Sequence, residues 1–166
     1  MAEVWSARDL ETGESVAVKI AQNWVAGDPH LRARFEREGR ILAQLQSPFV
    51  CGFRGSGHLE DGIPYLVLEK FTGETLRARL EREGILPFEE VAPLVDQILQ
   101  SLQVAHARRI VHRDLSPANV FLHRLTESRE IVKVLDFGVA KVIDPTSSIS
   151  STGKQATVGS IPYIAP

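Results

Sequence analysis

The chain has very little cysteine. Cys51 is the single cysteine among 166 residues, so an internal disulfide is excluded. The chain also lacks a run of about 20 apolar residues, which a membrane-spanning helix needs, and residues 1–20 lack a signal-peptide pattern. The charge is nearly balanced, with 19 Lys and Arg against 21 Asp and Glu. Nothing therefore favours nucleic acid or a membrane surface as a partner, and we expect a cytoplasmic segment, although an anchor outside it stays compatible.

What is present is the composition of an ordinary globular unit, 43% hydrophobic and 24% charged, without internal repeats. The first 70 residues are predicted to be rich in strands, with one helix. Asp28 and Pro29 begin that helix as N-cap and first helical residue, and apolar residues follow at helical spacing through Leu45. The strands are predicted at residues 3–7, 15–20, 50–59 and 63–71.

The remainder of the chain is predicted to be mainly helical, with short strands between. One helix covers residues 74–83 and ends at Gly84, and a longer one runs from Pro87 to Arg108. We therefore expect an α+β fold in two lobes, with a hinge near residues 69–73. Short strands are predicted at 110–111, 119–122 and 131–135, with the polar stretch 123–130 separating the last two.

The most informative segment combines two carboxylates and a carboxamide. Asp114 precedes Asn119 by five positions, and Asp136 follows later beside a glycine. Oxygen ligands of this kind suit Mg²⁺, and the set suits holding a metal and a nucleotide phosphate against a hydroxyl nucleophile. Each aspartate alone has a plain structural explanation, as a turn cap or an acceptor of backbone amides, but the ordered set favours catalysis. The two motifs are His112-Arg113-Asp114-Leu115-Ser116-Pro117-Ala118-Asn119 and Asp136-Phe137-Gly138.

A lysine and a glutamate in the first part of the chain are predicted to pair. Lys19 ends a strand segment, and alone it has the plain explanation of a solvated strand end. Glu38 lies in the apolar stripe of the predicted helix, between Phe35 and Leu42, where a carboxylate is costly unless it is paired. We expect an ion pair between Lys19 and Glu38; the alternative is that Glu38 reaches water at the edge of the stripe.

These motifs resemble those of protein kinases, in particular bacterial-type Ser/Thr protein kinases, and the resemblance spans essentially the whole chain. It implies a truncated protein-kinase-like two-lobe α+β fold, with residues 1–70 in the small lobe and 71–166 in the first part of the large lobe. It further implies ATP and Mg²⁺ as cofactors. The implied reaction is transfer of the γ-phosphoryl group of ATP to Ser or Thr hydroxyls of proteins.

The resemblance also implies a role for each motif residue. Asp114 would be the catalytic base, and Asn119 and Asp136 would be the metal ligands. Lys19, steadied by Glu38, would hold the α- and β-phosphates. Around the adenine the resemblance implies Val4, Ala17 and Phe121 as the sandwich, Leu76 as its extension, Leu68 as gatekeeper, and Glu69 and Phe71 as hinge residues. It also implies a hydrophobic column between the lobes made of Leu42, His112 and Phe137.

The chain departs from the family pattern in four places. Ala2 stands where the last glycine of the Gly-rich loop is expected, and the two earlier glycines and their strand are absent. The chain ends at Ala165-Pro166, the start of an Ala-Pro-Glu motif. We therefore expect an internal fragment of a kinase domain that has little or no activity alone. Ser116 replaces the usual lysine of Ser/Thr kinases, so slower chemistry, or another cation in its place, is expected.

Arg113 directly before Asp114 resembles kinases that are controlled by phosphorylation of the activation segment. We expect its guanidinium to be buried and to take a phosphate as partner. The acceptors would lie between Thr146 and Ser160, with Thr152 and Thr157 as the leading ones. The loop at 159–163 resembles that of Ser/Thr rather than tyrosine kinases.

Three alternatives remain open. One is a pseudokinase, a nucleotide-binding scaffold with a kinase fold, which Ala2 and Ser116 favour and the retained Lys19, Glu38 and Asp114 disfavour. Another is a small-molecule phosphotransferase of related fold, which usually lacks the Arg-Asp pair present here. The third is an unrelated α+β domain, which would need several coincident motifs.

Overall fold

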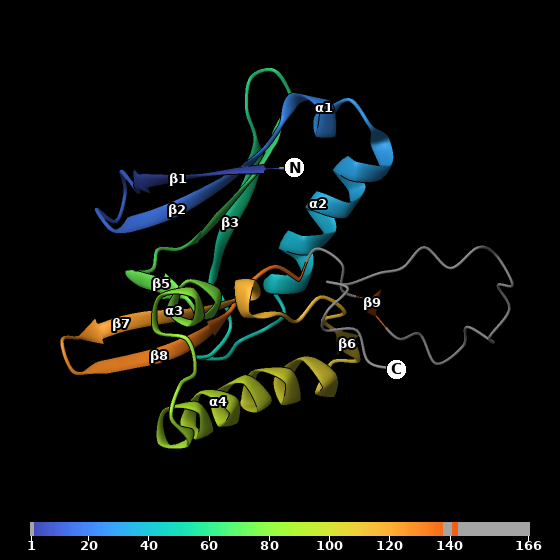
Figure 1. The fold of residues 1–166 in the computed structure, drawn as a ribbon. Helices are drawn as coiled ribbons and strands as arrows, with labels where there is room; N and C mark the ends of the chain where they lie inside the picture. Colours follow the sequence, from blue (N-terminus) through green and yellow to red (C-terminus); the bar gives the residue numbers. More distant parts are fainter. Residues whose placement is uncertain (1, 138–140, 143–166) are drawn as a thin grey trace, which may run out of the picture.

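The computed structural model describes residues 2–137 and the backbone of 141–142. Its elements form two groups, shown in Figure 1: an antiparallel sheet with helix α2 in the upper part of the view, and a hairpin with helix α4 in the lower part. This arrangement is the predicted two-lobe α+β fold. The division at residue 70 stays a prediction; in the structure, residues 70–72 connect the upper sheet to the lower part.

The upper sheet has the strand order β1-β2-β4-β3, and all its pairs are antiparallel. The turn after β1 is stabilised by Asp9, whose carboxylate accepts from the amides of Glu11 and Thr12. In the centre of the sheet, Ala17 of β2 pairs with Leu68 of β4, which places both on the wall that faces the lower lobe. The bounds are β1 (Ala2–Arg8), β2 (Ser15–Ala21), β3 (Phe53–His58) and β4 (Pro64–Glu69).

Helix α2 (Pro29–Leu42) begins as predicted. The Asp28 carboxylate accepts from the amides of His30 and Leu31 at 2.8 and 3.2 Å. Gly39 lets the helix lie close to the sheet, since a Cβ there would come within 2.6 Å of the Leu66 side chain. The short helix α1 (Asn23–Ala26) before it was not anticipated.

The lower lobe differs from the prediction at two places. The helix expected from residue 74 begins later: Gly73–Thr75 form strand β5, and the Thr75 hydroxyl caps α3 (Leu76–Glu83). The stretch 123–130 is not a separator, because β7 (Val120–Thr126) and β8 (Arg129–Val134) pair along its length. The polar side chains belong to the outer, exposed end of this hairpin, whereas the inner end is apolar and buried.

The remaining elements complete the lower lobe. Helix α4 (Phe88–Ala107) packs on β8 (Figure 1). The short strands β6 (Ile110–Val111) and β9 (Lys141–Val142) pair with each other, and the 3-10 helix η1 (Pro117–Asn119) precedes β7. None of the helices in the described part of the chain is both long enough and apolar enough to cross a membrane.

The two lobes share one hydrophobic core. The segment after α2 crosses to the hairpin, where the Cys51 amide donates to the Val134 carbonyl at 3.0 Å and the Val134 amide donates to the Phe49 carbonyl at 2.8 Å. Leu42, from the upper lobe, is buried in the same cluster as Val134. The end of β8, directly before Asp136, is therefore fixed against the upper lobe.

Candidate active site

A cavity of about 760 Å³ lies between the upper sheet, α2 and the β7–β8 hairpin. It receives side chains from both lobes. Leu76 is not among the lining residues and packs against the core instead, so its predicted place in the apolar stack is not supported. The other predicted catalytic, nucleotide-binding and metal-binding residues all line the cavity: Val4, Ala17, Lys19, Glu38, Leu68, Glu69, Phe71, Asp114, Asn119, Phe121 and Asp136.

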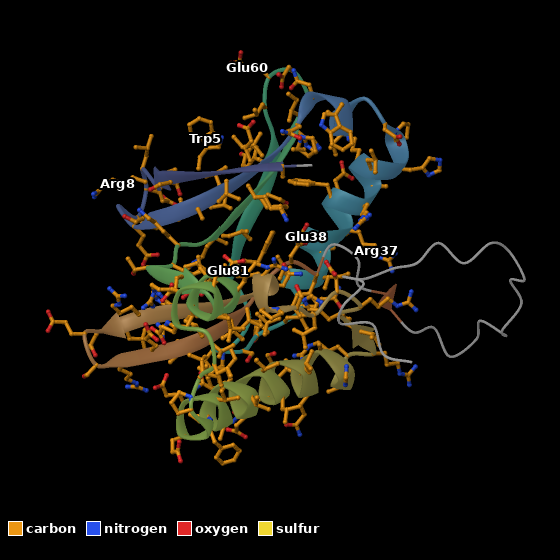
Figure 2. The ribbon with its side chains drawn as sticks, in the orientation of Figure 1. Trp5, Arg8, Arg37, Glu38, Glu60 and Glu81 are labelled. Carbon is orange, nitrogen blue, oxygen red and sulfur yellow. The ribbon has the colours of Figure 1, made fainter. Side chains whose placement is uncertain are left out.

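Lys19 and Glu38 form the expected ion pair. The Lys19 ammonium donates to Glu38 Oε1 at 2.7 Å and lies 3.7 Å from Asp136 Oδ1. The side chains of Lys19 and Glu38 are 16% and 6% exposed, so the alternative of Glu38 in water is excluded. Figure 2 shows Glu38 on the side of α2 that faces the sheet and the lower lobe, whereas the neighbouring Arg37 points away.

Burial and charge act against each other in this pair. Burial is the largest influence on Glu38 and raises the pKa of its carboxyl, although Lys19 opposes the change. Burial alone would lower the pKa of Lys19, but the carboxylates of Glu38 and Asp136 outweigh it, so the pKa of Lys19 is raised. Lys19 therefore stays an ammonium, directed at the cavity between two carboxylates.

The loop from His112 to Asn119 holds Asp114 in place. Asn119 Nδ2 donates to the Asp114 carbonyl at 2.7 Å and lies 3.3 Å from Asp114 Oδ2. His112 Nε2 donates to the Leu135 carbonyl at 2.8 Å, which leaves Nδ1 to accept from the Asp114 amide at 3.2 Å. Burial lowers the pKa of His112, so the ring stays neutral and connects the loop to the residue before Asp136.

Backbone strain marks the same two motifs. Arg113 and Asp136 have φ values of 67° and 55°, a region that residues other than glycine rarely adopt. Such strain persists only where the surrounding structure holds it, and it gathers at functional sites. The Arg113 side chain is exposed, so the prediction of a buried guanidinium is wrong.

The predicted column residues meet where the lobes join. Leu42, His112 and Phe137 are all buried, and the rings of His112 and Phe137 lie 4.6 Å apart. Their role as a column stays a prediction.

The opposite end of the cavity is apolar. Ala17 and Leu68 form its upper wall, and Phe121 from β7 forms the lower one. The ring of Phe71, from the connecting segment, lies 5.6 Å from that of Phe121. A flat aromatic base fits between such walls, while the charged groups at the other end suit phosphates and a metal.

The donor set fits Mg²⁺. Asp136 offers a carboxylate and Asn119 a carboxamide oxygen, beside a second carboxylate on Asp114. Mg²⁺ in nucleotide sites takes one or two protein carboxylates and completes its shell with phosphate oxygens and water.

Two residues of this region were missed by sequence reasoning. Cys51 lines the back of the cavity, where burial raises the pKa of its thiol to about 12, with Glu69 adding to the rise. Lys133 is buried in β8 and bonds to Glu69. A charged residue in the apolar run 131–135 was a usable signal, of the same kind that identified Glu38.

A family model described as protein kinase domain matches residues 1–166. The chain belongs to the protein kinase family. It is 34% identical over 169 residues to serine/threonine-protein kinase PknB of Mycobacterium leprae, an alignment that covers 100% of this chain and 26% of that protein. A probable serine/threonine-protein kinase of Streptomyces coelicolor is 38% identical over 169 residues, with 100% and 24% covered. Serine/threonine-protein kinase PknA of Mycobacterium tuberculosis is 35% identical over 170 residues, with 100% and 38% covered.

The family model and these alignments confirm the predicted resemblance to bacterial Ser/Thr protein kinases. The chain spans between 24% and 38% of the length of these three relatives. The acceptors predicted between Thr146 and Ser160, the loop at 159–163 and Ala165-Pro166 lie outside the described residues.

Proposed function

We propose that this kinase transfers the γ-phosphoryl group of ATP to Ser or Thr hydroxyls of proteins. The observation that carries the proposal is the convergence, on one cavity, of the Lys19–Glu38 pair with Asp114, Asn119 and Asp136. The apolar end of the cavity accommodates adenine. The relatives that cover the whole chain are named as serine/threonine-protein kinases, which supports protein hydroxyls as acceptors.

Phosphoryl transfer needs alignment and charge neutralisation more than covalent help from the protein. The Lys19 ammonium holds the α- and β-phosphates, and Glu38 keeps that ammonium in place. Asn119 and Asp136 hold Mg²⁺, which when bound neutralises charge on the phosphates. The Asp114 carboxylate orients the acceptor hydroxyl and accepts its proton, while Asn119 secures the Asp114 side chain.

Ser116 is the chemical departure in this scheme. Its side chain is buried within the loop from His112 to Asn119 and brings no positive charge to the reaction centre. We therefore propose a chemical step slower than that of kinases with lysine at this position. Ser116 is also the observation that favours the second candidate function, a nucleotide-binding scaffold without transfer.

The proposal is tested by Asp114→Asn in the full-length gene product. We expect the rate constant of autophosphorylation to fall by about a thousandfold, because general-base assistance contributes about 10² to 10⁴, while the Kd for ATP stays nearly the same. Asp96→Asn is the matched control, since Asp96 lies on the exposed side of α4 and accepts from Gln100. Full activity in Asp114→Asn would exclude Asp114 as the base.

The same assay separates the two candidate functions. A wild-type protein that binds ATP with Mg²⁺ but transfers no phosphate is a scaffold. We propose that the 166 residues expressed alone turn over little or no ATP, because α4 carries an uncovered apolar face in the described structure. The full-length product is therefore the sample for the assay.

A further inference from the structure

A second, partly buried ion pair lies at the segment that connects the lobes. Lys133, in β8, has a side chain only 7% exposed, and its ammonium donates to both carboxylate oxygens of Glu69 at 2.9 and 2.8 Å. Glu69 is the last residue of β4. A buried ammonium is costly unless it is paired and hydrogen-bonded, and Glu69 provides both interactions.

The Glu69 carboxylate is also fixed from a third side. The Gly52 amide donates to Glu69 Oε2 at 3.3 Å, and the Glu69 amide donates to the Gly52 carbonyl at 2.8 Å. A Cβ on Gly52 would lie 2.9 Å from Glu69 Oε2 and 3.2 Å from Glu69 Cβ. The carboxylate thus lies between the segment from α2 and strand β8, with little room to move.

Lys133 also contacts the next cavity-lining aromatic residue. Its ammonium lies 5.4 Å from the centre of the Phe71 ring, within the range of a cation–π interaction. Phe71 in turn packs against Phe121. Glu69 and Phe71 line the apolar end of the cavity, whereas Lys133 does not line it.

We propose that Lys133 is a positioning residue for the nucleotide base, a role that rests on the proposed function. It acts through two groups at once: the carboxylate of Glu69 and the ring of Phe71. Lys133 lies three residues before Asp136 on the same segment, so one rigid stretch carries the group that positions the base and the ligand that holds the metal. The spacing between the base-binding end and the metal-binding end of the cavity is thereby fixed by the protein.

Removal of the Lys133 ammonium should therefore weaken binding of the nucleotide base rather than binding of the phosphates. Without the ammonium, the Glu69 carboxylate turns toward water, and the backbone from Glu69 to Phe71 shifts with it. Lys133→Met keeps an unbranched side chain, one atom shorter, and removes the charge. We expect it to raise both the KM for ATP and the Kd for adenosine by roughly tenfold, with kcat changed by less than about twofold.

The measurements are made on the full-length gene product, with ATP turnover for KM and kcat and calorimetric titration for adenosine. Val132→Ala is the control for a merely structural loss, because Val132 is a buried neighbour in β8 that does not line the cavity. It lowers the melting temperature and leaves the adenosine Kd unchanged. In the double variant Glu69→Gln/Lys133→Met, we expect the adenosine Kd to rise by less than the product of the two single increases, because both changes break the same ion pair.

The outcomes separate this inference from the function on which it rests. A wild-type protein that binds neither ATP nor adenosine refutes the proposed function itself. If the wild type binds both, an unchanged or tighter adenosine Kd in Lys133→Met overturns the positioning role, as does weaker binding of ATP alone. Should Lys133→Met fail to fold, Glu69→Gln, which keeps the shape of the side chain, decides by the same readout.

Discussion

Glu38 determines how the cleft responds to acid. Burial holds the pKa of its carboxyl above the ordinary glutamate value, so this carboxyl takes up a proton before an exposed one as the pH falls. Protonation removes the charge that holds Lys19, and we expect ATP turnover to decline at a pH above 4.5, the ordinary value. The measurement is kcat/KM against pH in the full-length protein.

Protonation of Glu38 has opposite effects on activity and on stability: it lowers ATP turnover but favours the folded state. A raised folded-state pKa means that protonation of Glu38 favours the folded state at low pH, and that this contribution is lost as the pH rises through the raised pKa. The acid loss of activity should therefore precede any unfolding seen by circular dichroism. In Glu38→Gln the residual activity should lack this acid limb. A wild-type loss of activity that coincided with unfolding would contradict the assignment to Glu38.

The residues of the site show what sequence reasoning could and could not find. Asp114, Asn119 and Asp136 were predictable because their chemistry is concentrated in short motifs. Glu38 was predictable because a carboxylate interrupts an apolar stripe, and Lys133 carried the same kind of signal inside an apolar strand. Its partner could not be deduced, because Glu69 ends a different strand and only the packing of β4 against β8 brings the two together.

At the level of elements, caps and buried stripes were predicted correctly, and tertiary pairing was not. Helix α2 begins at its predicted cap because that cap is a local interaction. Strand β7 extends beyond its predicted end at residue 122 because its backbone pairs with that of β8. The polar side chains of this stretch, taken alone, suggest a loop. Strand β5 was missed because three residues carry no periodic pattern, and its strand character comes from pairing with β7.

Gly73 in β5 is the position where the backbone tolerates no side chain. Its φ is 131°, and a Cβ there would collide with the Leu122 carbonyl oxygen of β7. We expect Gly73→Ala to lower the free energy of unfolding by roughly 3 kcal/mol and to weaken ATP binding, because the connecting segment is pushed away from β7. Urea denaturation and ATP titration of the full-length protein measure the two effects.

Gly55→Ala is the matched control for this substitution. Gly55 lies in β3, and no atom lies within 4 Å of the place that a Cβ would take there, so its replacement should change stability by less than about 1 kcal/mol. Equal stability losses in the two variants would show that the close approach at Gly73 is not a constraint.

At the scale of the whole molecule, both lobes contribute to the core and to the cavity. The bridge between Val50 and Val134 joins them immediately before the Asp136 motif, and the Lys133–Glu69 pair joins them again a short distance away. The base-binding and phosphate-binding ends of the cleft are thus connected through β8. The two lobes were predictable from the strand-rich first 70 residues and the mainly helical remainder, whereas spacing along the chain does not show how the two groups of elements face each other.

Helix α4 sets the behaviour of the 166 residues as an isolated chain. Phe88, Val95 and Leu99 recur at helical spacing on one face, and Phe88 and Leu99 are 78% and 58% exposed. Uncovered apolar stripes of this kind promote association. We expect the isolated chain to self-associate in sedimentation velocity experiments, and Leu99→Glu to weaken that association by roughly tenfold because a charge then stands in the apolar stripe. Leu10→Glu is the control, since Leu10 is equally apolar but stands alone in the turn after β1. If both variants had the same effect, net charge rather than the α4 face would govern association.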